Sequence, residues 1–379
     1  MYIALTLDKD DSIPMMIPLF EKKQLDSISD KDYYRTEALY NLIWKPLVQE
    51  LEGKENVYFS PAGALHNIGI EYLPIDSTIN IADKYNLIRL SSTRELVIRH
   101  GTKAPTKAVL YGGLLYNIDP ELIQEDNQAN NYGPRYALMM RGLEDSLNTR
   151  SDFSSLGYTL REVESINELL TNERLTTKLF TKYNGTEESF KSLDGQGINI
   201  LHLATHGAYI PDQDAAKKKD EKNYRFIRLD DGNSQSVIED QSLTRSFLVM
   251  SGGNMLIHGD SIPEGLDDGI LTAQEISRLD LRGLDLVVLS ACETALGDIT
   301  SEGVMGLQRG FKKAGAQTIV MSLWKVADEQ TMQFMTEFYR LLSLGSGKRQ
   351  AFKGAQQYLR EAYPEQREKP FWSAFIMLD

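Results

Sequence analysis

Two kinds of hydrophobic pattern alternate along most of this chain of 379 residues. Short apolar runs without polar alternation are typical of strands that are buried on both faces of a parallel sheet. Between them lie segments with apolar residues at helical spacing, for example 160–170, where Val163, Ile166 and Leu170 share one face. From residue 107 onward this alternation predicts a doubly wound, mainly parallel α/β sheet.

The elements predicted for this sheet follow each other closely in the sequence. A buried segment is also expected over Phe247–Met250, and a long polar loop over 117–155 with one short helix near 136–147. The predicted strands cover 107–113, 176–180, 198–205, 286–289, 317–323 and 374–378, and the predicted helices cover 160–170, 187–193, 302–314, 328–343 and 348–361.

The first hundred residues show weaker patterns. Two apolar segments, Tyr2–Leu7 and Ile13–Phe20, predict a hairpin or two edge strands, and 32–51 has helical spacing that Pro46 kinks or breaks. Residues 56–69 have the pattern of a strand, a Pro-Ala-Gly turn and a second strand, 85–90 that of a strand, and 91–95 that of a cap before a short helix. We therefore expect a separate N-terminal α/β portion over 1–104, which contains no cysteine and is expected to be non-catalytic, and a second domain over 105–379.

Two of the apolar runs end on residues that can carry chemistry. The run over 284–289 leads through Ser290-Ala291 to Cys292, the only cysteine, and the run from Ile198 closes on His206-Gly207. A lone buried cysteine is often an inert small hydrophobe. However, ligands of open α/β sheets bind at the carboxyl ends of the strands, and a thiol needs a nearby base to form a thiolate near neutral pH. Neighbouring parallel strands would present Cys292 and His206 together, which predicts a cysteine nucleophile with a histidine base.

The other histidines are weaker candidates for the base. His258 belongs to a second His-Gly pair and is the main alternative, although the apolar run before it is shorter and interrupted. His202 lies inside the apolar run and is expected to pack as a strand residue, and His66 is expected to tie down a turn.

Several motifs in order resemble the CHAT domains, caspase-like cysteine peptidases that are often attached to TPR repeats. The two signature-like stretches are Leu201-His-Leu-Ala-Thr-His-Gly207 and Val287-Val-Leu-Ser-Ala-Cys-Glu-Thr-Ala-Leu-Gly297. Pro61-Ala-Gly63 is similar to an element of that family in which Asp usually stands at the position of Ala62. The resemblance covers roughly residues 30 to 379 and also includes Arg161–Glu164, Asp268–Ile276, Gly303–Phe311, Ala314–Ala316 and Val320–Val326.

This resemblance implies a fold and a reaction. The fold would be a caspase-like three-layer sandwich, with a mainly parallel central sheet between helices, plus an N-terminal pseudo-caspase-like portion. The reaction would be peptide-bond hydrolysis by a Cys292–His206 dyad, with the N–H groups of Gly207 and Cys292 holding the oxyanion. In related folds the residue two before the cysteine helps to form the substrate pocket, and here it is the uncharged Ser290. Further candidates for substrate binding are Trp324, Asp260, Glu293 and Asp328.

Composition and charge disfavour several classes of function. Hydrophobic residues make up 41% and charged residues 25%, as in ordinary globular proteins, and no run reaches the length of about 18 apolar residues that a membrane helix needs. A net charge of −13 disfavours direct nucleic-acid binding. The spacings typical of zinc or calcium ligands are missing from the sequence, so we expect no metal and no cofactor. One cysteine and no visible signal peptide favour a cytoplasmic location.

The sequence is compatible with three functions. The leading one is a CHAT-type endopeptidase acting on a protein target, activated by a partner or by an upstream TPR region, with a role in bacterial defence or signalling implied by the family. The alternatives are a catalytically silent caspase-like scaffold and a cysteine hydrolase of small amides or esters. His206 and Cys292 are 86 positions apart, and much of this separation is a charged stretch over 209–241, expected to be a solvated insertion or a regulatory, self-cleaved loop.

Overall fold

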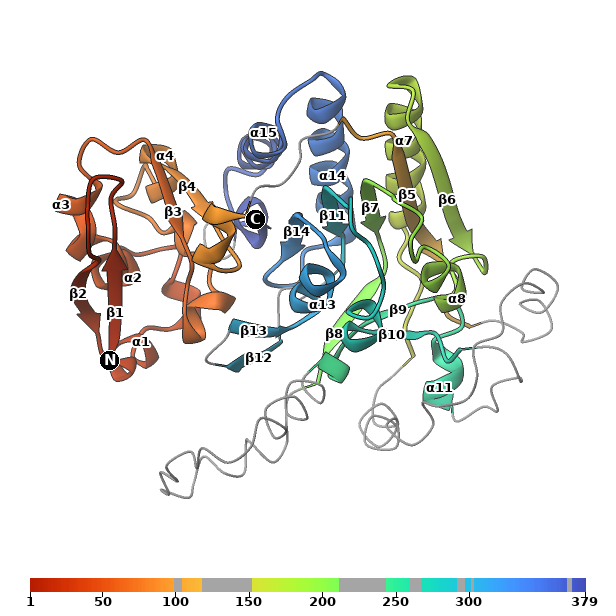
Figure 1. Cartoon of the computed structure of the whole chain (residues 1–379), viewed down its shortest axis with the longest axis horizontal. Coiled ribbons are helices and arrows are strands. Elements are labelled where there is room, and N and C mark those ends of the chain that lie inside the picture. Colours follow the sequence, from red (N-terminus) through yellow and green to blue (C-terminus); the bar gives the residue numbers. More distant parts are fainter. Residues whose placement is uncertain are drawn as a thin grey trace.

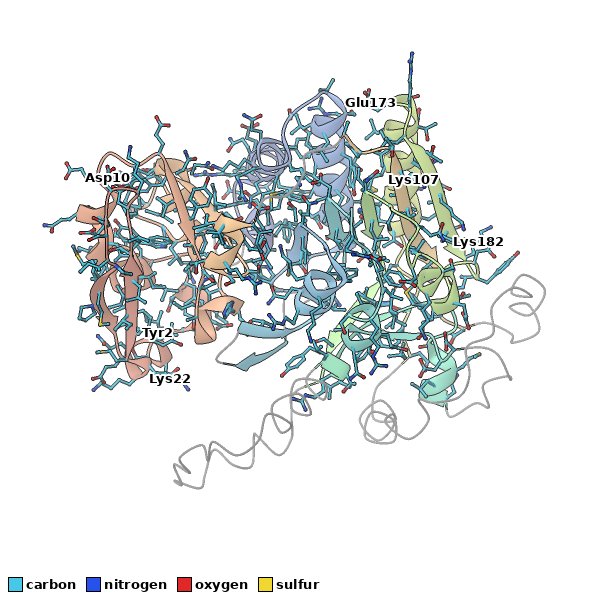
Figure 2. The ribbon with its side chains drawn as sticks, viewed as in Figure 1. Tyr2, Asp10, Lys22, Lys107, Glu173 and Lys182 are labelled. Carbon is cyan, nitrogen blue, oxygen red and sulfur yellow. The ribbon has the colours of Figure 1, made fainter. Side chains whose placement is uncertain are left out.

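A computed structural model describes residues 1–98, 104–117, 152–210, 243–258, 267–291, 297–300, 303–366 and 370–379. One eight-stranded sheet runs through most of the molecule, in the order β3-β4-β15-β14-β11-β7-β5-β6 (Figure 1). All neighbouring strands are parallel except β14 and β15, which confirms the predicted mainly parallel sheet. Its strands are β3 (Asn56–Phe59), β4 (Asn86–Arg89), β5 (Lys107–Leu114), β6 (Thr176–Lys182), β7 (Ile200–Leu203), β11 (Leu286–Leu289), β14 (Thr318–Ser322) and β15 (Phe375–Leu378).

Both faces of this sheet are covered by helices. Successive residues of a strand point to opposite faces, so Val109 packs into one apolar cluster and Ala108 and Leu110 into the other. The first cluster is closed by α8 (Glu187–Lys191), α12 (Ala273–Ile276) and α13 (Leu307–Ala314). The second is closed by α7 (Thr159–Asn172), α14 (Asp328–Ser343) and α15 (Lys348–Ala362). The three-layer arrangement predicted from the sequence is confirmed.

The described residues also form three small sheets, each of two or three strands. A hairpin of β1 (Tyr2–Thr6) and β2 (Met15–Phe20) confirms the predicted N-terminal strand pair. A second small sheet has the order β10-β9-β8, with β8 (His206–Tyr209), β9 (Ser246–Val249) and β10 (Ile270–Thr272). The third is the hairpin of β12 (Gly297–Thr300) and β13 (Gly303–Gly306).

The N-terminal part has its own apolar core but shares the central sheet. Side chains from 20 to 87, among them Phe20, Leu39, Trp44 and Leu73, form this core. Its strands β3 and β4 continue the sheet, because β4 pairs with β15 from the other end of the chain. Its short helices are α1 (Lys22–Asp26), α2 (Ala38–Ile43), α3 (Val48–Leu51) and α4 (Ile81–Lys84). A domain boundary at residues 104 and 105 remains a prediction.

Two predicted elements differ from the structure. The prediction of a second strand after the Pro-Ala-Gly turn is wrong, since Gly63–Asn67 forms a 3₁₀ helix that buries Leu65. Gly63 has a φ of +58°, and the hydroxyl of Tyr2 accepts a hydrogen bond from the N–H of Ala64, so the chain turns there instead of extending. The helix expected from residue 302 begins only at Leu307, because the residues before it pair with β12 as a hairpin.

Two predicted segments cannot be compared. The helix expected near 136–147 and the stretch 211–241 of the predicted insertion lie outside the described residues. Within the described part of the chain, no helix is long and apolar enough to cross a membrane.

Candidate functional site

The strands that precede the two predicted catalytic residues are neighbours in the sheet. β7 and β11 run parallel, and their register pairs Ile200 with Leu286 and Leu203 with Leu289. Each pair is 86 positions apart, which is also the separation of His206 and Cys292. After β11 the described chain runs to Ala291, and Cys292 itself lies outside the described residues.

His206 is held at the carboxyl end of β7, where β8 begins. Its Nε2 atom lies 2.7 Å from the carbonyl oxygen of Ser154. Its ring packs against two aromatic rings, with centroids 5.0 Å from Tyr116 and 5.2 Å from Phe153. These contacts fix both the position and the rotation of the imidazole.

The surroundings of His206 favour its neutral form. Burial lowers the pKa of His206, and the positive charge of Lys325 acts in the same direction, whereas the Ser154 hydrogen bond and Asp328 oppose the shift. A carbonyl oxygen only accepts hydrogen bonds, so Nε2 must carry the proton and donate it to Ser154. In the neutral ring Nδ1 is then the atom with a free lone pair, and it can accept a proton.

A short chain of hydrogen bonds anchors the residue before His206. The hydroxyl of Thr205 donates to the carbonyl of Val249 in β9, so the hydroxyl of Tyr116 donates to Thr205 over 2.9 Å. Tyr116, Thr205 and Val249 are all buried. Burial raises the pKa of Tyr116 to about 12, so its hydroxyl keeps the proton that it donates. Tyr116 therefore contacts the imidazole ring and also braces the turn that carries it.

The N–H of Gly207 points away from the strand that pairs with it. β8 pairs antiparallel with β9, and the N–H of Ile210 donates to Arg245 across this pair. Antiparallel pairs alternate between bonded and non-bonded, so the alternation places Ala208 among the bonded residues and turns the N–H of Gly207 away from β9. β8 is the edge strand of its sheet, so this N–H faces the open side.

A small pocket opens at the tips of β7, β11 and β14. It has a volume of about 20 Å³, room for roughly one water molecule. Thr205, Ser290, Ser322 and Asp328 supply polar groups to its wall. Ser322 donates to the carbonyl of Ala291 over 2.8 Å, whereas the buried hydroxyl of Ser290 has no hydrogen-bond partner among the described atoms.

The other predicted substrate-binding residues are distributed differently. Asp328 starts α14 and shares the pocket with Ser290, and its charge acts on the pKa of His206. Trp324 packs against Tyr34, with ring centroids 5.3 Å apart, and is absent from the wall of this pocket. Asp260 and Glu293 lie outside the described residues.

The three other histidines in the described part of the chain have structural surroundings. His202 is fully buried, as predicted for a packed strand residue, and its Nε2 lies 2.8 Å from Glu162 on α7. His66 lies in the 3₁₀ helix after the turn, and burial lowers its pKa to about 4. His258, the alternative base, ends α11 (Asn254–His258) and lies 2.8 Å from Asp152 with much of its side chain exposed.

A buried charge cluster supports the sheet that carries His206. Lys191 on α8 contacts Glu187, Asp267 and Glu275 at 2.7, 2.9 and 3.0 Å. Burial raises the pKa of the neighbouring Asp268 to about 7. These acidic groups flank β10, which pairs with β9 and through it with β8, so the 268–276 motif holds the sheet in place behind His206.

Sequence patterns did not identify the groups that orient His206. Ser154 acts through its backbone carbonyl, which carries no signal of residue type, and it comes from a stretch predicted only as a polar loop. Tyr116 has a weak signal, because it follows the carboxyl end of β5. Within the described ranges no group of three His, Cys, Asp or Glu side chains is arranged to hold a metal ion.

Comparisons with known proteins agree with the motifs. The family model described as "CHAT domain" matches residues 35–378. Tetratricopeptide repeat protein 28 from Mus musculus is 40% identical over 77 residues, which is 20% of this chain and 3% of that protein. The protein of the same name from Homo sapiens is 30% identical over 126 residues, or 32% of this chain and 5% of that protein. The chain thus matches a small fraction of the length of these curated relatives.

Two solved structures that match this chain are distant from it in sequence. The Arg-specific cysteine proteinase gingipain R has a TM-score of 0.48 at 12% identity, over 94% of this chain and 74% of that one. The Saccharomyces cerevisiae separase in its complex with securin has a TM-score of 0.39 at 10% identity, over 90% of this chain and 17% of that one.

Proposed function

This chain belongs to the CHAT domain family, and we propose that it is a cysteine endopeptidase in which Cys292 is the nucleophile and His206 the base. The observation that carries the proposal is the register of β7 and β11, which has the same offset as the two residues. Paired strands lie about 4.8 Å apart. The chain segments that leave β7 and β11, which lead to His206 and Cys292, therefore start close together. The neutral imidazole of His206, with Nδ1 free, supplies the base that such a thiol needs.

The reaction we propose proceeds through a thioester. Nδ1 of His206 takes the thiol proton, and the sulfur of Cys292 attacks the carbonyl carbon of the scissile peptide bond. The N–H groups of Gly207 and Cys292 stabilise the oxyanion, and such a donor typically contributes about 2.7–4 kcal/mol in the transition state. The imidazolium then protonates the leaving amine, and water hydrolyses the thioester with His206 acting again as base.

An open strand edge favours a peptide over a small amide as the substrate. β8 lies at the edge of its sheet, and the described strands leave its outer side unpaired. An extended peptide can bind such an edge through its main chain. The nearby pocket of about 20 Å³ is too small to enclose a whole substrate, so it fits a role as a subsite beneath a bound chain.

The chain offers a simple test, because it contains a single thiol. The rate of alkylation by iodoacetamide, followed by intact mass between pH 5 and 9, titrates Cys292 alone. An unassisted thiol has a pKa of about 8.5. We expect the wild type to react at least about tenfold faster than His206→Ala at pH 6.5, and Cys292→Ala not to react. His258→Ala is the matched control and should behave as the wild type.

Cleavage of a peptide library, read by mass spectrometry, tests the second half of the proposal. Cleavage by the wild type and by His258→Ala, but not by Cys292→Ala or His206→Ala, would support an endopeptidase. Equal alkylation of the wild type and His206→Ala would refute the dyad and favour the silent scaffold. An activated thiol without cleavage of any peptide would favour the hydrolase of small amides or esters.

The proposed cellular setting rests on relatives that contain repeats. Relatives named for tetratricopeptide repeats support the association of this domain with such repeats, and we propose that repeats or a partner control the peptidase. Direct nucleic-acid binding is not part of the proposal, given the net charge of −13. The cytoplasmic location and the role in bacterial defence stay predictions from the sequence.

A further inference from the structure

A second pocket lies between the N-terminal part of the chain and α15. Its volume is about 330 Å³, within the range of small-molecule sites, which starts at roughly 300 Å³. One side is formed by residues of α4 and β4, and the other by one face of α15 (Figure 1). The two sides are joined at the base of the pocket, where β4 pairs with β15.

One face of α15 brings positive charge to this pocket. Arg349, Lys353, Gln356 and Arg360 are spaced by four, three and four residues, so they lie on the same face of the helix. All four line the pocket, together with Arg89 from β4. The lining therefore contains four cationic side chains against only two carboxylates, although the chain as a whole has a net charge of −13.

Carboxylates pair with three of these four cations. Glu71 binds Arg89 through two hydrogen bonds of 2.9 and 2.6 Å. Asp83 binds Arg360 over 2.8 Å, and Arg349 pairs with Asp379.

Lys353 is the exception among these side chains. Among the described residues its partner is the neutral side-chain oxygen of Asn86, at 2.7 Å. Burial and the neighbouring Arg349 lower the pKa of Lys353. A bound anion would stabilise this side chain in its charged form.

The rest of the pocket wall is aromatic and apolar. Tyr72 and Trp372 meet edge to face, with ring centroids 5.5 Å apart, and Phe352, Leu87 and Met377 complete this wall. Inorganic phosphate alone would satisfy the cations but leave the apolar wall without contacts. A ligand that has both an anionic group and a flat apolar ring matches both halves of the pocket.

We propose that this pocket binds a small organic anion with an aromatic ring, of the size of a nucleoside monophosphate. The anionic group would contact Lys353 and Arg349, and the ring would lie against Tyr72, Phe352 and Trp372. This binding would be a function separate from the proposed peptidase reaction. It would place a ligand where the N-terminal part of the chain meets α15.

Isothermal titration of the whole chain with AMP and UMP tests this assignment, with adenosine and inorganic phosphate as half-ligands. We expect saturable one-to-one binding of at least one nucleotide, at least about tenfold tighter than either half-ligand. Lys353→Met keeps the length of the side chain and removes its charge, and it should weaken nucleotide binding at least about tenfold, the usual effect of losing a charged hydrogen bond. Arg340→Gln removes a surface charge from α14 that pairs with Glu337, and it should leave binding unchanged.

Three results would overturn the assignment. The first is that neither nucleotide binds at concentrations up to about 1 mM. The second is equal binding by the wild type and by Lys353→Met, with thermal unfolding showing that the variant is folded. The third is binding of phosphate as tight as that of the nucleotides, which would reduce the site to a simple anion site without a role for the aromatic wall.

Discussion

Replacing Glu71 by Gln should destabilise the whole molecule, because this carboxylate neutralises a buried arginine at the junction of its two parts. The side chains of Arg89 and Glu71 are only 3% and 6% exposed, and two hydrogen bonds join them. Glutamine has nearly the same shape, but its NH₂ group faces an arginine N–H and the charge is lost. Arg89 keeps its hydrogen bonds to the carbonyls of Ile68 and His66 and its position over the ring of Phe59.

The magnitude follows from the burial of the remaining charge. Removing one partner of a buried ion pair typically costs about 3–5 kcal/mol. The remaining carbonyl and ring contacts of Arg89 put the expected loss near the lower end, at about 3 kcal/mol. With an unfolding entropy of roughly 2.1 cal/mol/K per residue over 379 residues, the midpoint should fall by about 4 °C.

Urea unfolding followed by circular dichroism, and thermal scans, measure this loss. Glu337→Gln is the matched control: the same substitution removes the partner of Arg340, whose side chain is 48% exposed, and exposed pairs contribute about 0–1 kcal/mol. A double variant, Glu71→Leu with Arg89→Met, removes both charges and should recover most of the loss. A loss below about 1 kcal/mol for Glu71→Gln, or a double variant less stable than the single one, would refute the reasoning.

Three further predictions concern packing and protonation. Gly310→Ala should cost about 1–3 kcal/mol in urea unfolding, because a Cβ at this position would lie 2.5 Å from the carbonyl oxygen of Ala273. Burial lowers the pKa of His66 to about 4 in the native state, so below pH 6.5 the unfolded chain binds a proton that the native chain does not. This difference destabilises the wild type by at most about 3 kcal/mol between pH 6.5 and 4. In His66→Gln the stability should therefore fall less over this pH range. Asp328→Asn should move the acidic limb of the pH profile of kcat/KM to lower pH, because Asp328 raises the pKa of His206 and its removal leaves the opposing effect of burial.

Each of these predictions has its own control. Gly157→Ala should be nearly neutral, since no atom lies within 4 Å of the position that its Cβ would take, and equal losses at both glycines would contradict the packing argument. Identical stability profiles of the wild type and His66→Gln between pH 4 and 6.5 would show that His66 protonates freely in the folded state. An acidic limb that moves to higher pH in Asp328→Asn would contradict the conclusion that Asp328 raises the pKa of His206.

Much of the fold could be predicted because its strands are buried on both faces. The runs that end at Leu203 and Leu289 contain few polar residues, and this composition is typical of strands inside a parallel sheet. Helix α14 has the predicted bounds, and α15 differs from its predicted bounds by one residue, because long amphipathic stretches fix their own periodicity. The start of α13 was predicted five residues too early, because the β12–β13 hairpin depends on pairing that local pattern does not show.

The chemistry of the candidate site follows from the sequence in part. Cys292 and His206 could be singled out by their place after apolar runs. Their roles remain a proposal, because Cys292 lies outside the described residues. The tautomer of His206 could not be predicted, since it depends on a backbone carbonyl 52 positions away, at Ser154.

The sequence by itself determined the class of fold, the family and the two residues to test, because apolar runs and motif order are local properties of the chain. The tertiary structure decided which strands are neighbours, which atom of His206 is free, and how β4 and β15 join the two parts of the molecule. It also decided that the cations of α15 line a pocket rather than an exposed surface, since helical spacing predicts a shared face but not what packs against it. Contacts between distant segments depend on the whole packed chain, and no single stretch of sequence encodes them.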